Sequence, residues 1–200
     1  MQKSIITVSM ALSFAVPALA YEAPFTATAP NIDGQTDSDL WDLANWQSIE
    51  HIAVGEVDNG SDFKGQYKVL WDHQKIYLLV SLEDDILIDT HPDPLLQYWD
   101  DDALEIFIDQ DNSGGIHLDN HNAYAYHIGL DNQVVDIDTD GKPALFNSHL
   151  KSKWQRNTEA PFAVTWEVAL EVYDESNNPD QRVSLSAGQI LGFMLSLIHI

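Results

Sequence analysis

The sequence contains no cysteine among its 200 residues, so it has neither a disulfide bond nor a lipidated cysteine. Basic residues are also few, because 9 Lys and Arg stand against 32 Asp and Glu, which gives a formal net charge of −23. A surface of this charge repels nucleic acids and anionic membranes and attracts divalent cations. We therefore expect no nucleic-acid partner, although most of these acids could serve only solubility in a salty environment.

Long apolar runs are missing as well, since a helix that crosses a bilayer needs about 20 such residues. The apolar segment 5–16 is shorter, follows the single cation Lys3 and precedes the small residues of Ala18-Leu19-Ala20. This order is typical of a secretory signal peptide. We expect cleavage after Ala20, no membrane span, and a periplasmic or secreted protein. The alternative is an uncleaved anchor.

The rest of the chain, residues 21–200, shows no internal repeat or linker and is expected to form one domain. A short helix is expected near its start, capped by Thr36 or Asp37. Its apolar face would carry Leu40, Trp41 and Ala44, with Trp41 buried in the core rather than bound to a ligand. Eight strand-like segments with polar turns between them follow, which predicts an all-β, antiparallel β-sandwich. These segments are residues 49–54, 63–71, 76–82, 103–109, 122–130, 133–137, 145–154 and 162–172.

The stretch Tyr98 to Gly115 combines an aromatic pair, three aspartates and a strand. Two prolines in the segment before it exclude a regular helix or central strand, so a long loop delivers Trp99. Strand periodicity places Glu105 on the face opposite Leu104 and its apolar neighbours. Sugars stack their CH faces on aromatic rings and donate hydroxyl hydrogen bonds to carboxylates. Trp99 and Glu105 therefore predict half of a carbohydrate site; the alternatives are a buried Trp99 and a merely solvent-facing Glu105.

The turn after this strand has the start of a calcium loop. Oxygen-bearing side chains alternate at Asp109, Asp111 and Ser113 before two glycines, and Asp119 lies nearby. An EF-hand would need a preceding helix and an acid at its twelfth position, where Asn120 stands. The turn is thus no EF-hand, but it is a candidate for a hard cation such as structural calcium. The alternative is an acidic turn without metal.

These landmarks, taken in order, resemble the family 9 carbohydrate-binding modules. The matching motifs are Ile32-Asp33-Gly34 with Asp37 and Trp41, VLWD at 69–72, IYLLVSLED at 76–84, WDDDALEIFID at 99–109, WEV at 166–168 and Leu191-Gly192-Phe193. The resemblance implies a jelly-roll-like β-sandwich with structural calcium that holds a sugar between two aromatic rings. It assigns the first ring to Trp99 and a hydroxyl-binding carboxylate to Glu105. Where the family offers a basic side chain on the next strand, the local match is Tyr126 or His127, which departs from the family pattern.

The C-terminus departs further from the family. The resemblance implies a second ring from a loop after the Gly-Phe strand, but the sequence stops at Ile200. Residues 195–200, LSLIHI, resemble translated sequencing-adaptor read-through joined to a truncated gene. On this interpretation the last strand and half of the site are missing; the alternative is a genuine short end.

The function expected from these features is non-catalytic binding of a mono- or oligosaccharide in support of carbohydrate catabolism. A glycoside hydrolase is a candidate partner, because relatives of the family serve as the binding part of such enzymes. One alternative is a glycosidase itself, which needs two carboxylates a few ångströms apart, such as Glu105 and Glu167. No sequence feature pairs these two acids.

Two metal-dependent alternatives remain open. Related sandwiches bind haem for electron transfer through His and Met, and Met194 is the available methionine. Zinc binding would use His117, His121 and His127, but no helix places the first two on one face.

Overall fold

The computed structural model describes residues 21–36, 39–49, 64–84, 86–114, 120–174 and 181–198. Several expectations lie outside these ranges. They are the signal peptide over residues 1–20, most of the segment 49–54, the cap Asp37 and the candidate ligands His117 and Asp119. Within the described ranges, no helix has the length and apolar character to cross a bilayer.

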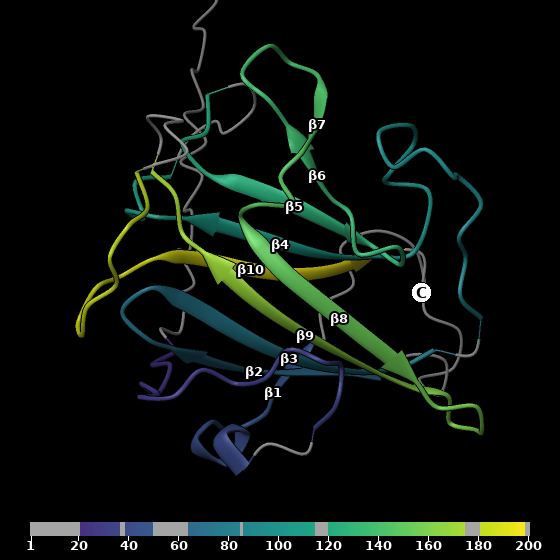
Figure 1. The fold of residues 1–200 in the computed structure, drawn as a ribbon, viewed down its shortest axis with the longest axis horizontal. Coiled ribbons are helices and arrows are strands. Elements are labelled where there is room, and N and C mark those ends of the chain that lie inside the picture. The colour runs from purple at the N-terminus through teal and green to yellow at the C-terminus, as the bar shows by residue number, and fades with distance from the viewer. Residues whose placement is uncertain are drawn as a thin grey trace, which may run out of the picture.

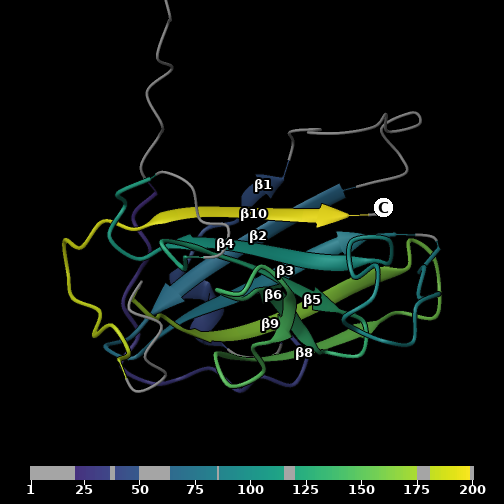
Figure 2. The same ribbon diagram turned by 90° about the horizontal axis from the view of Figure 1, so that it is seen from above.

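The described residues form ten strands in two sheets of five, and the sheets face each other (Figures 1 and 2). The strands of each sheet pair antiparallel, so the predicted antiparallel β-sandwich is confirmed. The first sheet consists, in spatial order, of β1 (Gln47–Ile49), β2 (Lys64–Trp71), β3 (Lys75–Glu83), β9 (Ala163–Glu171) and β8 (Leu150–Arg156). The second consists of β10 (Gly192–Ile198), β4 (Ala103–Asp109), β5 (Tyr124–Gly129), β6 (Val134–Ile137) and β7 (Pro143–Leu145).

The main core lies between the two sheets and follows from the two-residue period of the strands. In β4, Leu104, Ile106 and Ile108 are at most 1% exposed and belong to this core. Alternate residues of β3, among them Leu78 and Val80, belong to it too and have no exposed surface. Burial of such apolar area is the main source of stability in a chain without disulfide bonds.

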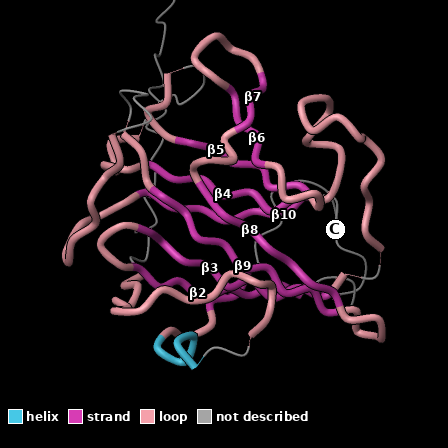
Figure 3. The backbone as a smooth tube through the Cα atoms, in the orientation of Figure 1, coloured by secondary structure: helices cyan, strands magenta, loops and turns pink. Residues whose placement is uncertain are grey.

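A second apolar cluster covers the outer face of the first sheet. The helix η1 (Asp39–Leu43), cyan in Figure 3, is a 3-10 helix that places Trp41 over this face. Trp41 packs there with Ile32, Leu79 and Ala169. Because β3 and β9 are covered on both faces, their residues form nearly continuous apolar runs rather than an alternating pattern. The predicted helix and the buried Trp41 are both confirmed.

A fully buried carboxylate, Glu167, connects this outer layer to the sheet. One oxygen accepts the backbone N–H groups of Asp33 and Gly34 at 2.9 and 3.0 Å, and the other accepts the indole N–H of Trp41 at 2.9 Å. Gly34 has a φ of +84°, and a Cβ there would lie 2.9 Å from the carbonyl carbon of Trp154. Only glycine fits this turn. Two motifs of the resemblance, Ile32-Asp33-Gly34 with Trp41 and the WEV segment, thus meet at one side chain.

The strand expected over residues 145–154 begins later than its sequence predicts. Phe146 donates its N–H to the carbonyl of Val134, and His149 donates to the carbonyl of Phe146. These bonds close a turn, so β8 begins only at Leu150. The short edge strand β7 precedes this turn and was not expected from the sequence.

A histidine lies within an aromatic part of the main core. His149 is 6% exposed and stacks on Tyr173 with ring centroids 3.8 Å apart. Its Nδ1 atom lies 2.7 Å from the hydroxyl of Tyr126, which can donate to it. Burial disfavours the charged imidazolium and lowers the pKa of His149 from 6.5 to about 4.

This shift predicts a loss of stability in acid. As the pH falls below 6.5 the unfolded state binds a proton at His149, whereas the native state does so only near pH 4. The contribution of the neutral His149 to the free energy of unfolding, about 3 kcal/mol, is therefore complete above pH 6.5 and is lost as the pH falls towards 4. Urea unfolding between pH 4 and 7 checks this, because wild type should lose stability relative to His149→Gln by about that amount. Tyr126→Phe, which keeps the imidazole, should retain the wild-type slope; parallel curves for wild type and His149→Gln would contradict it.

The buried carboxylate predicts a second stability effect. In Glu167→Gln, an amide NH₂ group replaces one carboxylate oxygen, and it donates hydrogen bonds instead of accepting them. At least one of the buried N–H groups that bond to Glu167 then has no acceptor. We expect a loss of about 2–4 kcal/mol in the free energy of unfolding, measured by urea denaturation. Glu83→Gln is the matched control, since Glu83 makes only a partly exposed ion pair with Lys64 and should change stability by less than about 1 kcal/mol. Equal effects of the two variants would contradict this account of Glu167.

Candidate functional site

The candidate site lies on the outer face of the second sheet, where β4 and β5 pair. The register places Glu105 directly opposite His127, and Glu105 Oε1 lies 2.6 Å from His127 Nε2. Glu105 is only 8% exposed, so it is not the solvent-facing acid of the alternative interpretation. Burial acts to raise the pKa of its carboxyl, but the hydrogen bonds from His127 and Ser196 and the His127 charge outweigh burial and lower it.

The loop over residues 86–102, at the right of Figure 1, is folded back on itself by two aspartates. Asp102 accepts the N–H of Ile88 at 2.6 Å and returns its own N–H to the Ile88 carbonyl. Asp101 accepts the N–H and hydroxyl of Thr90, together with the N–H of His91 and a contact from its ring. Burial opposes ionisation of Asp101, yet these donors lower its pKa to about 2. The carboxylates therefore fix the loop backbone.

The loop presents two aromatic rings beside the Glu105–His127 pair. The Tyr98 ring lies edge-on to His127, with centroids 4.7 Å apart at an interplanar angle of 79°. Trp99 contacts Tyr98 edge-on at 4.9 Å and remains 54% exposed. The predicted exposure of Trp99 is confirmed, whereas its contact with a ligand stays a prediction.

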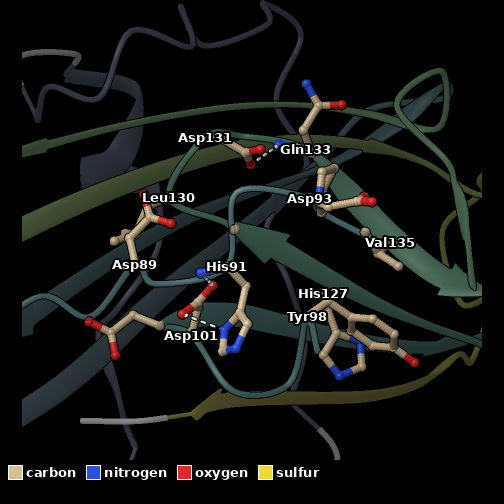
Figure 4. A pocket seen from close by; sticks show the side chains of 13 residues that line it. Asp89, His91, Asp93, Tyr98, Asp101, His127, Leu130, Asp131, Gln133 and Val135 are labelled. Carbon is tan, nitrogen blue, oxygen red and sulfur yellow. Dashed lines mark hydrogen bonds and ion pairs between the residues drawn. The ribbon is translucent and has the colours of Figure 1, made fainter. Parts of the chain in front are cut away.

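A small pocket of about 40 Å³ opens between this loop and the β5–β6 turn (Figure 4). His91 and Asp101 lie on one side of it, and Tyr98 and His127 lie together on another. The described residues that line it include no Lys or Arg. They are Asp89, His91, Asp93, Pro94, Tyr98, Asp101, Asp102, His127, Gly129, Leu130, Asp131, Gln133 and Val135.

The prediction of Tyr126 as a sugar-binding residue is corrected by the structure. It pairs with Ile106 rather than Glu105 and is fully buried in the main core. Its hydroxyl contacts His149 and its ring stacks on Tyr124 with centroids 5.2 Å apart. Successive residues of a strand point to opposite faces, so only His127 of the two candidates reaches the site.

The glycosidase alternative depended on Glu105 and Glu167 acting as a pair, and the structure places these two carboxylates apart. Glu167 belongs to the first sheet, has no exposed surface and is bonded to Asp33, Gly34 and Trp41. Glu105 lies on the outside of the second sheet. A substrate cannot reach both carboxylates together.

The candidate calcium turn is closed by its own backbone. One oxygen of Asp109 accepts the N–H groups of Asp111 and Ser113, and the other accepts the N–H of Gly114 at 2.7 Å. Asp111 also accepts the Ser113 N–H at 3.0 Å. Among the described residues, no group of three or more His, Cys, Asp or Glu could hold a metal ion. With Asp119 outside the described ranges, calcium binding stays a prediction.

The two described zinc candidates, His121 and His127, lie in different surroundings. His121 is 1% exposed and contacts the aromatic core, whereas His127 pairs with Glu105 on the outer face. Met194 lies on the edge strand β10 and is 53% exposed. His121 and His127 therefore do not combine into a zinc site, and haem binding through Met194 stays a hypothesis.

Sequence reasoning missed the part of the pocket that comes from the loop and the β5–β6 turn. The sequence indicates Tyr98 only as a neighbour of Trp99, and no pattern in it singles out His91, Asp131 or Gln133 as site residues. The length of the loop and its prolines did indicate a functional segment. Which of its side chains would face His127 depends on how Asp101 and its neighbour fold the loop back.

Comparison with known proteins identifies similar domains. A family model described as "Carbohydrate family 9 binding domain-like" matches residues 32–199. Endo-1,4-beta-xylanase A of Thermotoga maritima is 29% identical over 137 residues, which are 66% of this chain and 12% of the xylanase. Endo-1,4-beta-xylanase A of Thermotoga neapolitana is 33% identical over 98 residues, or 47% of this chain and 9% of the xylanase. The chain thus matches only about a tenth of each enzyme.

Solved structures show the same fold. A family 9 carbohydrate-binding module of Caldicellulosiruptor kristjanssonii in complex with glucose has a TM-score of 0.59 and 17% identity. That match covers 88% of this chain and 78% of the module. A module of the same family and organism in complex with cellotriose gives the same TM-score and identity, covering 88% and 76%. At this identity the likeness establishes the fold.

Proposed function

We propose that this member of the carbohydrate family 9 binding domain-like family binds the end of a sugar chain at the 86–102 loop without transforming it. The observation that carries the proposal is the exposed Trp99 ring, which lies in the loop leading directly to the Glu105–His127 pair. The ring offers a flat apolar surface to the sugar CH groups. The pair offers a fixed, ionised acceptor for hydroxyl groups.

The ligand proposed is a neutral mono- or oligosaccharide. Glucose and cellotriose occupy the structural relatives named above, and the sequence relatives are xylanases. These facts support a neutral hexose or pentose end as the first class to test. The pocket itself holds little more than one functional group, so a sugar ring would rest over it rather than within it.

The proposed cellular role is to hold a carbohydrate for enzymes that degrade it. The apolar segment and small residues near the N-terminus support export to the periplasm or the exterior. The similarity to a small part of each xylanase supports a glycoside hydrolase partner.

The proposal predicts that Trp99→Ala weakens sugar binding. Removing a central aromatic contact from a small site should raise the Kd at least about tenfold, the usual effect of losing such an anchor. Isothermal titration with glucose, xylose, cellotriose and a xylo-oligosaccharide measures this. Trp46→Ala is the matched control, because Trp46 is 39% exposed near η1, outside the pocket. Unchanged affinity in Trp99→Ala, or no binding of any sugar by folded wild type, would refute the proposed site.

The charge of the pocket predicts discrimination against acidic sugars. Asp89, Asp93 and Asp131 are exposed on its rim, without a Lys or Arg among its described lining. Glucuronate should therefore bind at least about tenfold more weakly than glucose at low ionic strength. The difference should shrink in about 1 M salt, where charges are screened beyond about 3 Å. Competition experiments against a bound neutral sugar measure both, and equal or tighter binding of glucuronate would contradict this prediction.

A further inference from the structure

Both ring nitrogens of His127 face oxygen atoms. Nδ1 lies 3.0 Å from the backbone carbonyl oxygen of Ala125, and Nε2 lies 2.6 Å from Oε1 of Glu105. A backbone carbonyl can only accept a hydrogen bond, and so can an ionised carboxylate. If both contacts are hydrogen bonds and Glu105 is ionised, each ring nitrogen must therefore carry a proton.

A neutral imidazole has a single N–H and cannot satisfy both contacts in that way. If it donated to Ala125, its Nε2 lone pair would face a Glu105 oxygen at 2.6 Å, where two acceptors repel each other. The alternative is a neutral pair in which Glu105 carries the proton and donates it to Nε2. Two protonation patterns are thus compatible with the geometry, and they differ in where one proton lies.

The surroundings favour the ionised pair. Ser196 of β10 donates a second hydrogen bond to Glu105, and a donor at this oxygen-only acceptor favours the ionised carboxylate. Asp136 of β6 acts on His127 as a further negative charge, and the Tyr98 ring meets it edge-on. Around the pocket, the other titratable groups are His91 and the aspartates Asp89, Asp93, Asp101, Asp102 and Asp131. No described Lys or Arg lines this pocket to compete for the role of the cation.

We propose that His127 is an imidazolium that donates to Ala125 and Glu105 at once, and thereby holds Glu105 ionised and oriented for the ligand. His127 is then a positioning residue, which acts on the ligand through Glu105. The proposal rests on the proposed sugar site for its functional consequence, but the protonation state of the pair does not depend on it.

The arrangement makes ligand binding depend on pH. When His127 loses its proton, Nε2 and Glu105 Oε1 become two acceptors in contact and must move apart. Glu105 is then no longer fixed, so a hydroxyl group loses its oriented, charge-assisted acceptor. Affinity for a sugar should fall as the pH rises, with the loss of a single proton.

The first experiment examines the proton directly. Nitrogen-15 NMR of the histidine rings in the ligand-free protein distinguishes an imidazolium, with two N–H nitrogens, from a neutral ring with one. The His127 signal is assigned by its disappearance in His127→Gln. Near neutral pH we expect two protonated nitrogens in wild type, and a neutral ring at the same pH in Glu105→Gln. A neutral His127 beside Glu105 in wild type would overturn the proposal.

The second experiment tests the positioning role by titrating glucose and cellotriose between pH 6 and 9. Wild-type affinity should fall at least about fivefold over this range. His127→Gln keeps a donor for Glu105 that cannot titrate, so its affinity should stay within about twofold across the range. His73→Gln, a residue that contacts Leu185 and does not line the pocket, should retain the wild-type profile.

The outcomes separate the two proposals. A wild-type profile that His127→Gln reproduces would overturn the role of His127 even if sugar binds. If neither sugar binds to folded protein, the proposed function fails, and the NMR result alone still decides whether His127 is the imidazolium.

Discussion

The register of β4 against β5 is the constraint on which both the core and the candidate site depend. It places Glu105 opposite His127 on the outer face and Ile106 opposite Tyr126 in the core. A slip by one residue would bury the carboxylate–histidine pair and expose the apolar row. The apolar packing between the sheets, which stabilises the fold, therefore also brings the two ionisable groups of the site into contact.

Some of the acidic residues have a structural role beyond their contribution to the net charge. Glu167 and Asp101 accept several N–H groups each and thereby fix a turn or a loop. A chain without cysteine thus uses carboxylates to attach irregular segments to its sheets. The same physical property, an ionised oxygen that accepts strong hydrogen bonds, is what Glu105 offers on the outer face.

Membership in the carbohydrate family 9 binding domain-like family accounts for the sandwich and for the motifs that meet at Glu167. It does not account for the histidine that occupies β5 beside Glu105. There the imidazole of His127 contacts the carboxylate, and the Tyr98 ring lies edge-on to that imidazole. Differences of this kind at one position decide which ligand a shared fold selects.

The all-β class, the buried Trp41 and the two faces of β4 could be predicted from the sequence, because side-chain period and apolar runs are local properties. The sequence left Tyr126 and His127 as alternatives for one position, although their alternation already placed them on opposite faces. The three-dimensional arrangement was needed to show that Glu167 is buried and bonded to the outer layer, and that Tyr98 and His91 line the pocket. Those contacts join residues far apart in the chain, and they depend on sheet order, strand register and the fold of one long loop, none of which a local pattern specifies.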